Sequence, residues 1–171
     1  NKKEVTIVAI IPNFFLNAVV AIGIDIVGGE KQWIGTGFIV GRKENDNREL
    51  STYYIITNKH VIVSQKCVYV RFNSLVGQLV KDYRVDLYDK DGLPLFSAHP
   101  NKMTDIVALQ ILPGTLINDQ SIWGAFDLED HALTLEQMKE TGVEEGSLVY
   151  ALGFPMNLVE DIKTPICRLG C

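Results

Sequence analysis

The sequence predicts an all-β protein. Its apolar residues occur in short runs rich in valine, isoleucine and aromatic side chains, which are typical of strands. Glycine, asparagine and aspartate separate these runs and supply the backbone conformations that turns need. Only residues 133–141 have the spacing of an amphipathic helix, with Leu135, Met138 and Lys139 before a terminating Gly142. We therefore expect strands, not helices, to enclose the core.

Composition limits the classes of protein and of partner. With 171 residues, 47% of them apolar, the chain can bury an ordinary core in one domain, or in one domain and part of another. Its net charge of -5 argues against a nucleic-acid partner, because binding to a polyanion depends on clustered basic residues. The most apolar window, residues 5–27, is interrupted by Pro12, Asn17 and Asp25, so we predict neither a membrane span nor a secretory signal.

The cysteines and histidines do not indicate a metal site or a cofactor. Cys67, Cys167 and Cys171 are an odd set, and the spacing of the last two is neither that of a zinc knuckle nor that of a redox pair. Cys67 is interpreted as a small apolar strand residue. The odd number slightly favours a reduced, cytoplasmic compartment and leaves localisation otherwise open. No glycine-rich loop of the phosphate-binding kind follows a predicted strand.

The first predicted strand covers residues 18–27, after a turn or short helical piece at 12–17. Its even positions are expected to form an apolar face, and these are Val20, Ile22, Ile24 and Ile26. Gly28 and Gly29 then supply the positive φ angles of a hairpin. This strand should therefore turn back and pair with the next run of the chain.

Further strands are expected along the first two thirds of the chain. A solvated loop at 43–49 and an Asp-Gly turn at 89–92 separate some of them. Together they are enough to close one small barrel. The predicted ranges are 33–42, 52–58, 68–72, 79–88, 93–98 and 105–112.

The character of the sequence changes after residue 117. Residues 118–146 are interpreted as a linker that holds the short helix, and two more strands are predicted at 147–154 and 165–169. Two strands cannot close a barrel by themselves. The predicted organisation is an N-terminal extension (1–17), a first barrel (18–117), the linker (118–146) and the beginning of a second barrel (147–171).

Four separated phrases in the sequence point to one family. The strand Tyr54-Ile55-Ile56-Thr57 ends at Asn58-Lys59-His60-Val61; Gly35-Thr36-Gly37-Phe38 precedes it, and Thr104-Asp105-Ile106-Val107 follows it. A last phrase, Tyr150-Ala151-Leu152-Gly153-Phe154-Pro155, lies near the end. Together these phrases resemble the trypsin-like serine peptidases, especially their bacterial, HtrA-related branch. The resemblance extends over roughly residues 18–171.

The resemblance implies a trypsin-like double β-barrel that hydrolyses peptide bonds through an acyl-enzyme. By their places in the motifs, His60 would be the general base and Asp105 the carboxylate that orients it. The separation of 45 positions leaves room for three strands to return the chain to the same rim of the barrel. On the residues alone, His60 could be a surface residue at a strand end, and Asp105 could be a turn residue that bonds its own backbone.

The expected nucleophile is missing from the sequence. In the family, serine lies in a Gly-x-Ser-Gly-like turn after the Gly-x-Pro strand, so the resemblance implies a serine beyond Cys171 and no activity for residues 1–171 alone. His99 and His131 are rival bases without strand context. The serines without the required setting are Ser51, Ser64, Ser74, Ser97, Ser121 and Ser147.

Other interpretations remain beside the peptidase. The chain could be an inactive protease-fold module that binds an extended peptide or protein partner by strand addition. Its incomplete second barrel could also pair two copies in a homodimer. Ile26-Val27-Gly28-Gly29 resembles the amino terminus that digestive trypsin-like enzymes expose on activation, but we interpret it as the hairpin tip. Gly35 and Gly37 either allow close packing near the histidine or mark a bulge.

Overall fold

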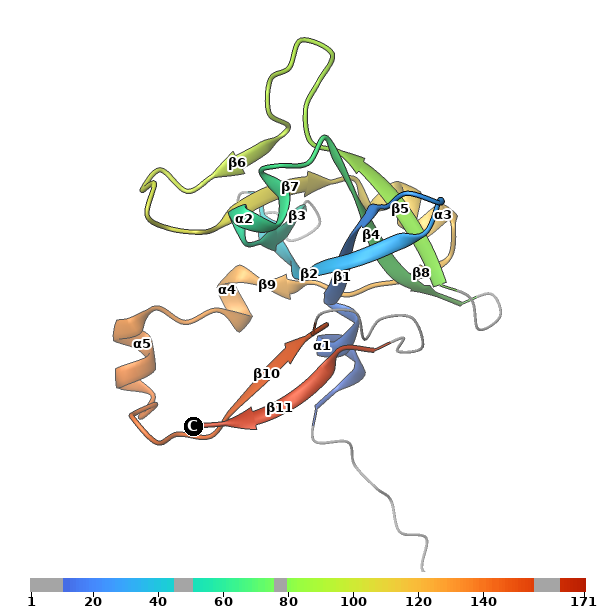
Figure 1. Cartoon of the computed structure of the whole chain (residues 1–171). Helices are drawn as coiled ribbons and strands as arrows, with labels where there is room; N and C mark the ends of the chain where they lie inside the picture. Colours follow the sequence, from blue (N-terminus) through green and yellow to red (C-terminus); the bar gives the residue numbers. More distant parts are fainter. Residues whose placement is uncertain (1–10, 45–50, 76–79, 156–163) are drawn as a thin grey trace, which may run out of the picture.

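The computed structural model describes residues 11–44, 51–75, 80–155 and 164–171. It is mostly β, with one large curled sheet and one sheet of two strands (Figure 1). Every described helix is six residues long or shorter. The all-β prediction is therefore confirmed at the level of fold class. Parts of the predicted extension, of the loop at 43–49 and of the strand at 79–88 lie outside the described residues.

The large sheet contains most of the predicted strands. Its order is β5-β4-β1-β2-β3-β7-β6, and all neighbours in this path are antiparallel. The long β2 is shared, because its first part pairs with β1 and its second part with β3. The bounds are β1 (Val19–Asp25), β2 (Lys31–Lys43), β3 (Ser51–Thr57), β4 (Cys67–Ser74), β5 (Val80–Asp86), β6 (Phe96–Ala98) and β7 (Val107–Ile111).

Among the described residues the large sheet curls like half of a barrel, and the complete first barrel that was predicted is not confirmed. β5 and β6 are its two ends, and within the described residues no strand ladder joins them. The segment between them folds back on itself, with an isolated bridge between Tyr88 and Pro94 and a hydrogen bond of 2.9 Å from the Leu95 N–H to the Leu87 carbonyl. Proline has no N–H to give to a ladder. The strand predicted at 93–98 is accordingly reduced to β6.

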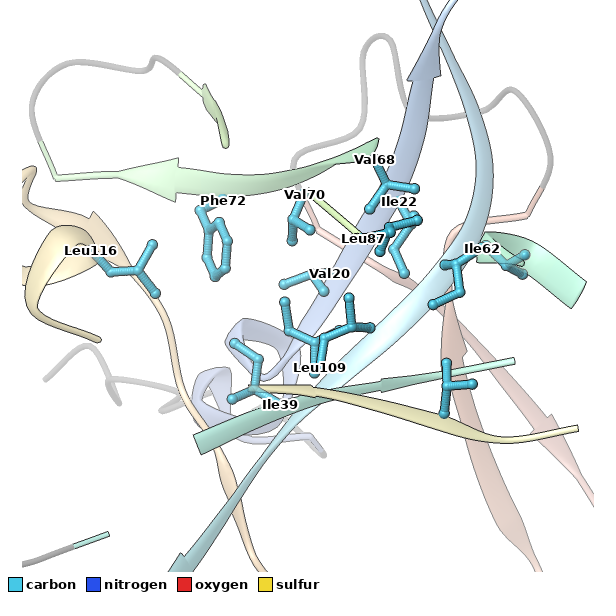
Figure 2. Packing of buried hydrophobic residues seen from close by; sticks show 13 residues of the cluster. Val20, Ile22, Ile39, Ile62, Val68, Val70, Phe72, Leu87, Leu109 and Leu116 are labelled. Atoms are coloured by element: carbon cyan, nitrogen blue, oxygen red, sulfur yellow. The ribbon is translucent and has the colours of Figure 1, made fainter. Parts of the chain in front are cut away.

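The core lies inside the curl of the large sheet (Figure 2). Side chains from β1, β2, β3, β4 and β7 meet there, with Ile62 and Leu116 from two short helices and Leu87 from the residue that follows β5. Burial of such side chains is the main favourable term in folding. The labelled members are Val20, Ile22, Ile39, Ile62, Val68, Val70, Phe72, Leu87, Leu109 and Leu116.

The first strand is buried on both faces, which the sequence pattern did not predict. Val20 and Ile22 face the main core as expected, but Ala21 on the other face is also fully buried. Ala21 packs with Trp33, and Phe154, the residue after β10 (Val149–Gly153), packs against this pair. Ile26 is exposed instead of belonging to the apolar face. Gly28 and Gly29 have φ angles of 106° and 83°, which confirms the hairpin tip.

The segment predicted as a linker contributes to the large sheet. Its short strand β8 (Ser121–Ile122) pairs with β4, and β9 (Phe126–Asp127) runs parallel to β2. Lys43 of β2 holds this region, because its Nζ lies 2.9 Å from a carboxylate oxygen of Asp127. The helices are α1 (Asn13–Asn17), α2 (Lys59–Ile62), α3 (Pro113–Asn118), α4 (Leu128–His131) and α5 (Leu135–Glu140).

The predicted short helix is present as α5, and the two last strands form their own sheet. α5 begins at a capping box in which Thr134 and Gln137 each bond the other's backbone, and Gly142 follows its end with a φ angle of 76°. The small sheet pairs β10 (Val149–Gly153) with antiparallel β11 (Ile166–Gly170). It lies below the large sheet in Figure 1.

Candidate active site

His60 lies on the short helix α2, three residues after the last residue of β3. The sequence had placed it at the end of the strand. β3 ends at Thr57, Asn58 has extended backbone angles, and α2 begins at Lys59. The two residues after His60, Val61 and Ile62, are buried in the core. They anchor the helix, whereas 72% of the His60 side-chain surface remains exposed. The imidazole is therefore displayed on a fixed backbone.

Gly35 allows α2 to lie close to β2. A Cβ atom at Gly35 would be only 2.7 Å from Val61 Cγ1, a distance that carbon atoms do not tolerate. The register between β1 and β2 shifts here as well, because Ile22 pairs with Gly35 and the next residue, Gly23, pairs with Trp33. Both interpretations of this glycine therefore hold, since it sits beside a bulge and is also the point of close packing under the histidine.

Asp105 reaches His60 because β7 pairs with β3. Val107 is opposite Thr57 in that ladder, so the residues just before β7 lie beside the residues just after β3. Asp105 Oδ1 accepts the backbone N–H of His60 at 2.9 Å, and Oδ2 contacts His60 Nδ1. The Asp105 carbonyl accepts a hydrogen bond from Asn58 Nδ2 at 3.0 Å. The structure thus brings together the two residues that the sequence selected.

The surroundings of Asp105 keep its side chain ionised. The hydrogen bond with the His60 ring, followed by the hydrogen bond from the His60 backbone N–H, lowers the pKa of Asp105 below its ordinary value. About 45% of this side chain is exposed. Its carboxylate is an acceptor for Nδ1–H, which leaves the lone pair of the neutral ring on Nε2.

His60 Nε2 has no hydrogen-bond partner among the residues that the structure describes. An imidazole whose Nδ1 is held by a carboxylate and whose Nε2 is open can take a proton from a hydroxyl group within hydrogen-bond distance of Nε2. The carboxylate would then stabilise the positive charge that forms on the ring. This pair is thus chemically suited to act as a general base.

The rival histidines have local roles instead. His99 Nδ1 accepts the backbone N–H of Asn101 at 3.1 Å, and His131 Nδ1 accepts that of Asp127 at 2.9 Å. Within the part of the chain that the structure describes, neither ring has a hydrogen bond to a carboxylate of the kind that His60 has. Both are thus turn or helix-end residues in which a ring nitrogen satisfies a nearby backbone donor.

Several serine hydroxyls make hydrogen bonds to groups other than the His60 ring. Ser64 Oγ accepts from Gln65 Nε2 at 3.1 Å, and Ser147 Oγ accepts from the Glu144 N–H at 3.0 Å. Ser121 Oγ shares a hydrogen bond of 2.7 Å with the Tyr83 hydroxyl. These contacts agree with the sequence argument that none of the three lies in a nucleophile turn.

The described part of the chain has neither a metal-binding cluster nor a membrane helix. No group of three or more histidine, cysteine, aspartate or glutamate side chains is positioned there to hold a metal ion. None of the helices described is long and apolar enough to cross a membrane. Cys67, Cys167 and Cys171 are free thiols.

Thr36 is a connecting residue that the sequence motifs did not reveal. Its Oγ1 accepts the Phe154 N–H at 2.8 Å and is 3.3 Å from the Phe154 carbonyl, to which it donates. The Thr36 carbonyl accepts from Thr57 Oγ1 at 2.9 Å, three residues before the histidine. Thr36 therefore ties the second sheet to the strand that presents His60. The only signal in the sequence was a hydroxyl residue between two glycines.

Comparison of the chain with protein-family models, with curated proteins and with solved structures found no match.

Proposed function

We propose that this chain supplies the general base and the orienting carboxylate of a trypsin-like serine peptidase, similar to the HtrA-related branch. The observation that supports the proposal best is the double contact of Asp105 with His60, which holds Nδ1 and leaves Nε2 open to solvent. In this proposal the nucleophilic serine follows Cys171, and the fold is a double barrel whose second half begins with β10 and β11.

The proposed reaction is hydrolysis of a peptide bond. As the serine oxygen attacks the substrate carbonyl, His60 Nε2 takes the hydroxyl proton, and it returns that proton to the leaving amine when the C–N bond breaks. Water then attacks the acyl-enzyme by the same route and releases the acid. Asp105 stays ionised throughout, which the lowered pKa of its carboxyl group supports.

The proposal is tested with a fluorophosphonate probe on the full-length protein translated from the natural reading frame. Such probes react with a serine only where a base activates it, so we expect covalent labelling that His60→Ala abolishes. His99→Ala is the matched control, because His99 is exposed and its ring accepts the backbone N–H of Asn101 in the same turn. Labelling that persists in His60→Ala, or a reading frame without a Gly-x-Ser-Gly-like turn, contradicts the proposal.

A second candidate function is a protease-fold module that binds an extended peptide without cleaving it. It is favoured by the small sheet, in which β11 pairs only with β10 among the described strands and Leu169 is 59% exposed. Strand addition at an open edge supplies main-chain hydrogen bonds to a peptide. Full-length protein that binds peptides but is not labelled by the probe would support this function over the peptidase.

The same open edge supports the proposal of a homodimer. Unpaired strand edges with apolar side chains associate readily, and Val149, Tyr150 and Leu169 are exposed on β10 and β11. We expect a dimer of residues 1–171 in sedimentation velocity experiments at high protein concentration. A single monomeric species at every concentration would exclude the dimer.

A further inference from the structure

An apolar cavity of about 550 Å³ lies between the large sheet and β10. Its floor is formed by Val19 of β1 and Val40 of β2, on the face of the sheet opposite the main core, and Leu152 of β10 lines it from the other side. Figure 1 shows α1, β9 and α4 in the same region between the two sheets. This volume is within the range of sites that bind small molecules, roughly 300–1,000 Å³.

Three phenylalanines from different elements form one wall of the cavity. Phe15 of α1 stacks on Phe126 of β9 with ring centroids 5.6 Å apart, and the edge of Phe38 of β2 meets Phe126 at 6.1 Å. Each ring restrains its neighbour, so the wall exists without a ligand. Phe38 and Tyr150 also line the cavity and are 40% and 48% exposed, which makes the interior accessible from solvent.

His131 places one defined hydrogen-bond donor at this cavity. Its Nδ1 accepts the backbone N–H of Asp127, so the neutral ring carries its proton on Nε2. Nε2 makes no hydrogen bond within the described residues, and the rings of Phe14 and Phe15 flank the imidazole at 5.5 and 5.8 Å. The donor is therefore oriented by one backbone contact and two aromatic neighbours.

The charges around His131 favour a neutral ligand over an anion. Glu129 and Asp130 lie on the same short helix, and the protein carries a net charge of -5. The nearby cation Lys43 is already paired with Asp127 and Asp130. A carboxylate would meet repulsion there, whereas an uncharged carbonyl oxygen can accept from Nε2–H without that cost.

We propose that this cavity binds a small, uncharged and largely apolar molecule with a carbonyl group, which accepts a hydrogen bond from His131 Nε2. The apolar part of the ligand packs against Val19, Val40 and the phenylalanine wall. This site is separate from the His60–Asp105 pair, and its occupancy does not depend on peptidase activity.

The first experiment titrates residues 1–171 with 2-nonanone and follows the backbone amides by two-dimensional NMR. We expect saturable shifts at residues that line the cavity, such as Val40 and Leu152. Ala132→Trp should abolish them, because Ala132 is exposed at the cavity rim and the indole would fill the space. Leu93→Trp is the control, since Leu93 is an exposed residue in a distant turn. Absent or unsaturable shifts, or binding that Ala132→Trp leaves intact, would overturn the proposal.

The second experiment tests the hydrogen bond. In 2-nonanone labelled with ¹³C at the carbonyl, we expect the carbonyl resonance to move downfield on binding, and we expect His131→Leu to weaken binding about fivefold. Nonanoate, with the same chain and a negative charge, should bind more weakly than the ketone to the unmodified protein. An unmoved carbonyl resonance or tighter binding of nonanoate would overturn the assignment, even if His131→Leu fails to fold.

Discussion

Asp105 holds His60 at two points, through the backbone N–H at 2.9 Å and through the ring nitrogen Nδ1. The first contact fixes the start of α2, and the second sets the orientation and tautomer of the imidazole. A carboxylate that only capped a turn would account for the backbone contact but not for the ring contact. The pair therefore has the arrangement of a base and its orienting group.

Replacement of Asp105 by asparagine tests the second contact. In Asp105→Asn the side-chain amide oxygen can still accept a hydrogen bond from the His60 backbone N–H. The substitution removes, however, the negative charge that stabilises a protonated ring. For the full-length protein we expect kcat on a peptide substrate to fall about 10⁴-fold, the loss that follows this change in known triads. Asp86→Asn, at an exposed ion pair with Arg84, is the control and should leave kcat unchanged. A fall of less than tenfold would argue against the orienting role.

Gly35→Ala tests the packing beneath the histidine. The new methyl group would lie 2.7 Å from Val61 Cγ1, so the Val61 side chain or the helix that carries it must shift, and we expect the unfolding free energy to fall by about 1–3 kcal/mol. The double variant Gly35→Ala, Val61→Ala should recover part of this loss, because the two sites are in contact. Gly114→Ala has no atom within 4 Å of the new carbon and should be neutral or slightly stabilising. Urea denaturation of these three variants, together with the single variant Val61→Ala that completes the cycle, gives the unfolding free energies, and equal effects at both glycines would contradict the packing argument.

Thr36→Val tests the connection between the two sheets. Valine has the same shape as threonine but cannot accept the Phe154 N–H, which donates to Thr36 Oγ1 at 2.8 Å. We expect the free energy of unfolding to fall by about 1–3 kcal/mol and hydrogen exchange at the Phe154 amide to become much faster. The exposed Thr115→Val serves as the control. Unchanged exchange at Phe154 would show that this contact does not hold the second sheet.

The acid stability of the protein should depend on Asp127. The ion pair with Lys43 lowers the pKa of Asp127 from 3.8 to about 2. Because the pKa is lower in the folded state, the ionised Asp127 stabilises that state at pH values above its pKa in the unfolded chain. This contribution is lost as the pH falls from about 4 towards about 2. Asp127→Asn keeps the helix cap of α4 but removes the charge, so its stability should fall less steeply over this pH range. Lys43→Met should also make the unfolding free energy less dependent on pH over this range. If the unfolding free energy of either variant falls with pH as steeply as that of the unmodified protein, the assignment is contradicted.

Features encoded in a few neighbouring residues were predictable from the sequence. Gly28 and Gly29 predicted the hairpin, because few other residues adopt positive φ angles, and the capped segment before Gly142 predicted α5. His60 and Asp105 were selected by the short phrases that contain them. Their contact follows from the pairing of β3 with β7, which the spacing of the two residues allowed.

The remaining features depend on contacts between distant residues. Thr36 and Phe154 are 118 positions apart, and β9 joins β2 through only two residues, so neither contact leaves a periodic pattern in the sequence. β1 appeared to have one apolar face, but the second sheet covers the other face as well. The sequence by itself thus determined most of the longer strands, the hairpin turn at Gly28 and Gly29 and the choice of the histidine–aspartate pair, because these depend on local backbone preference and local motifs. Only the tertiary structure decided the open curl, the connection between the sheets and the apolar cavity, because these depend on which side chains meet after the chain has folded.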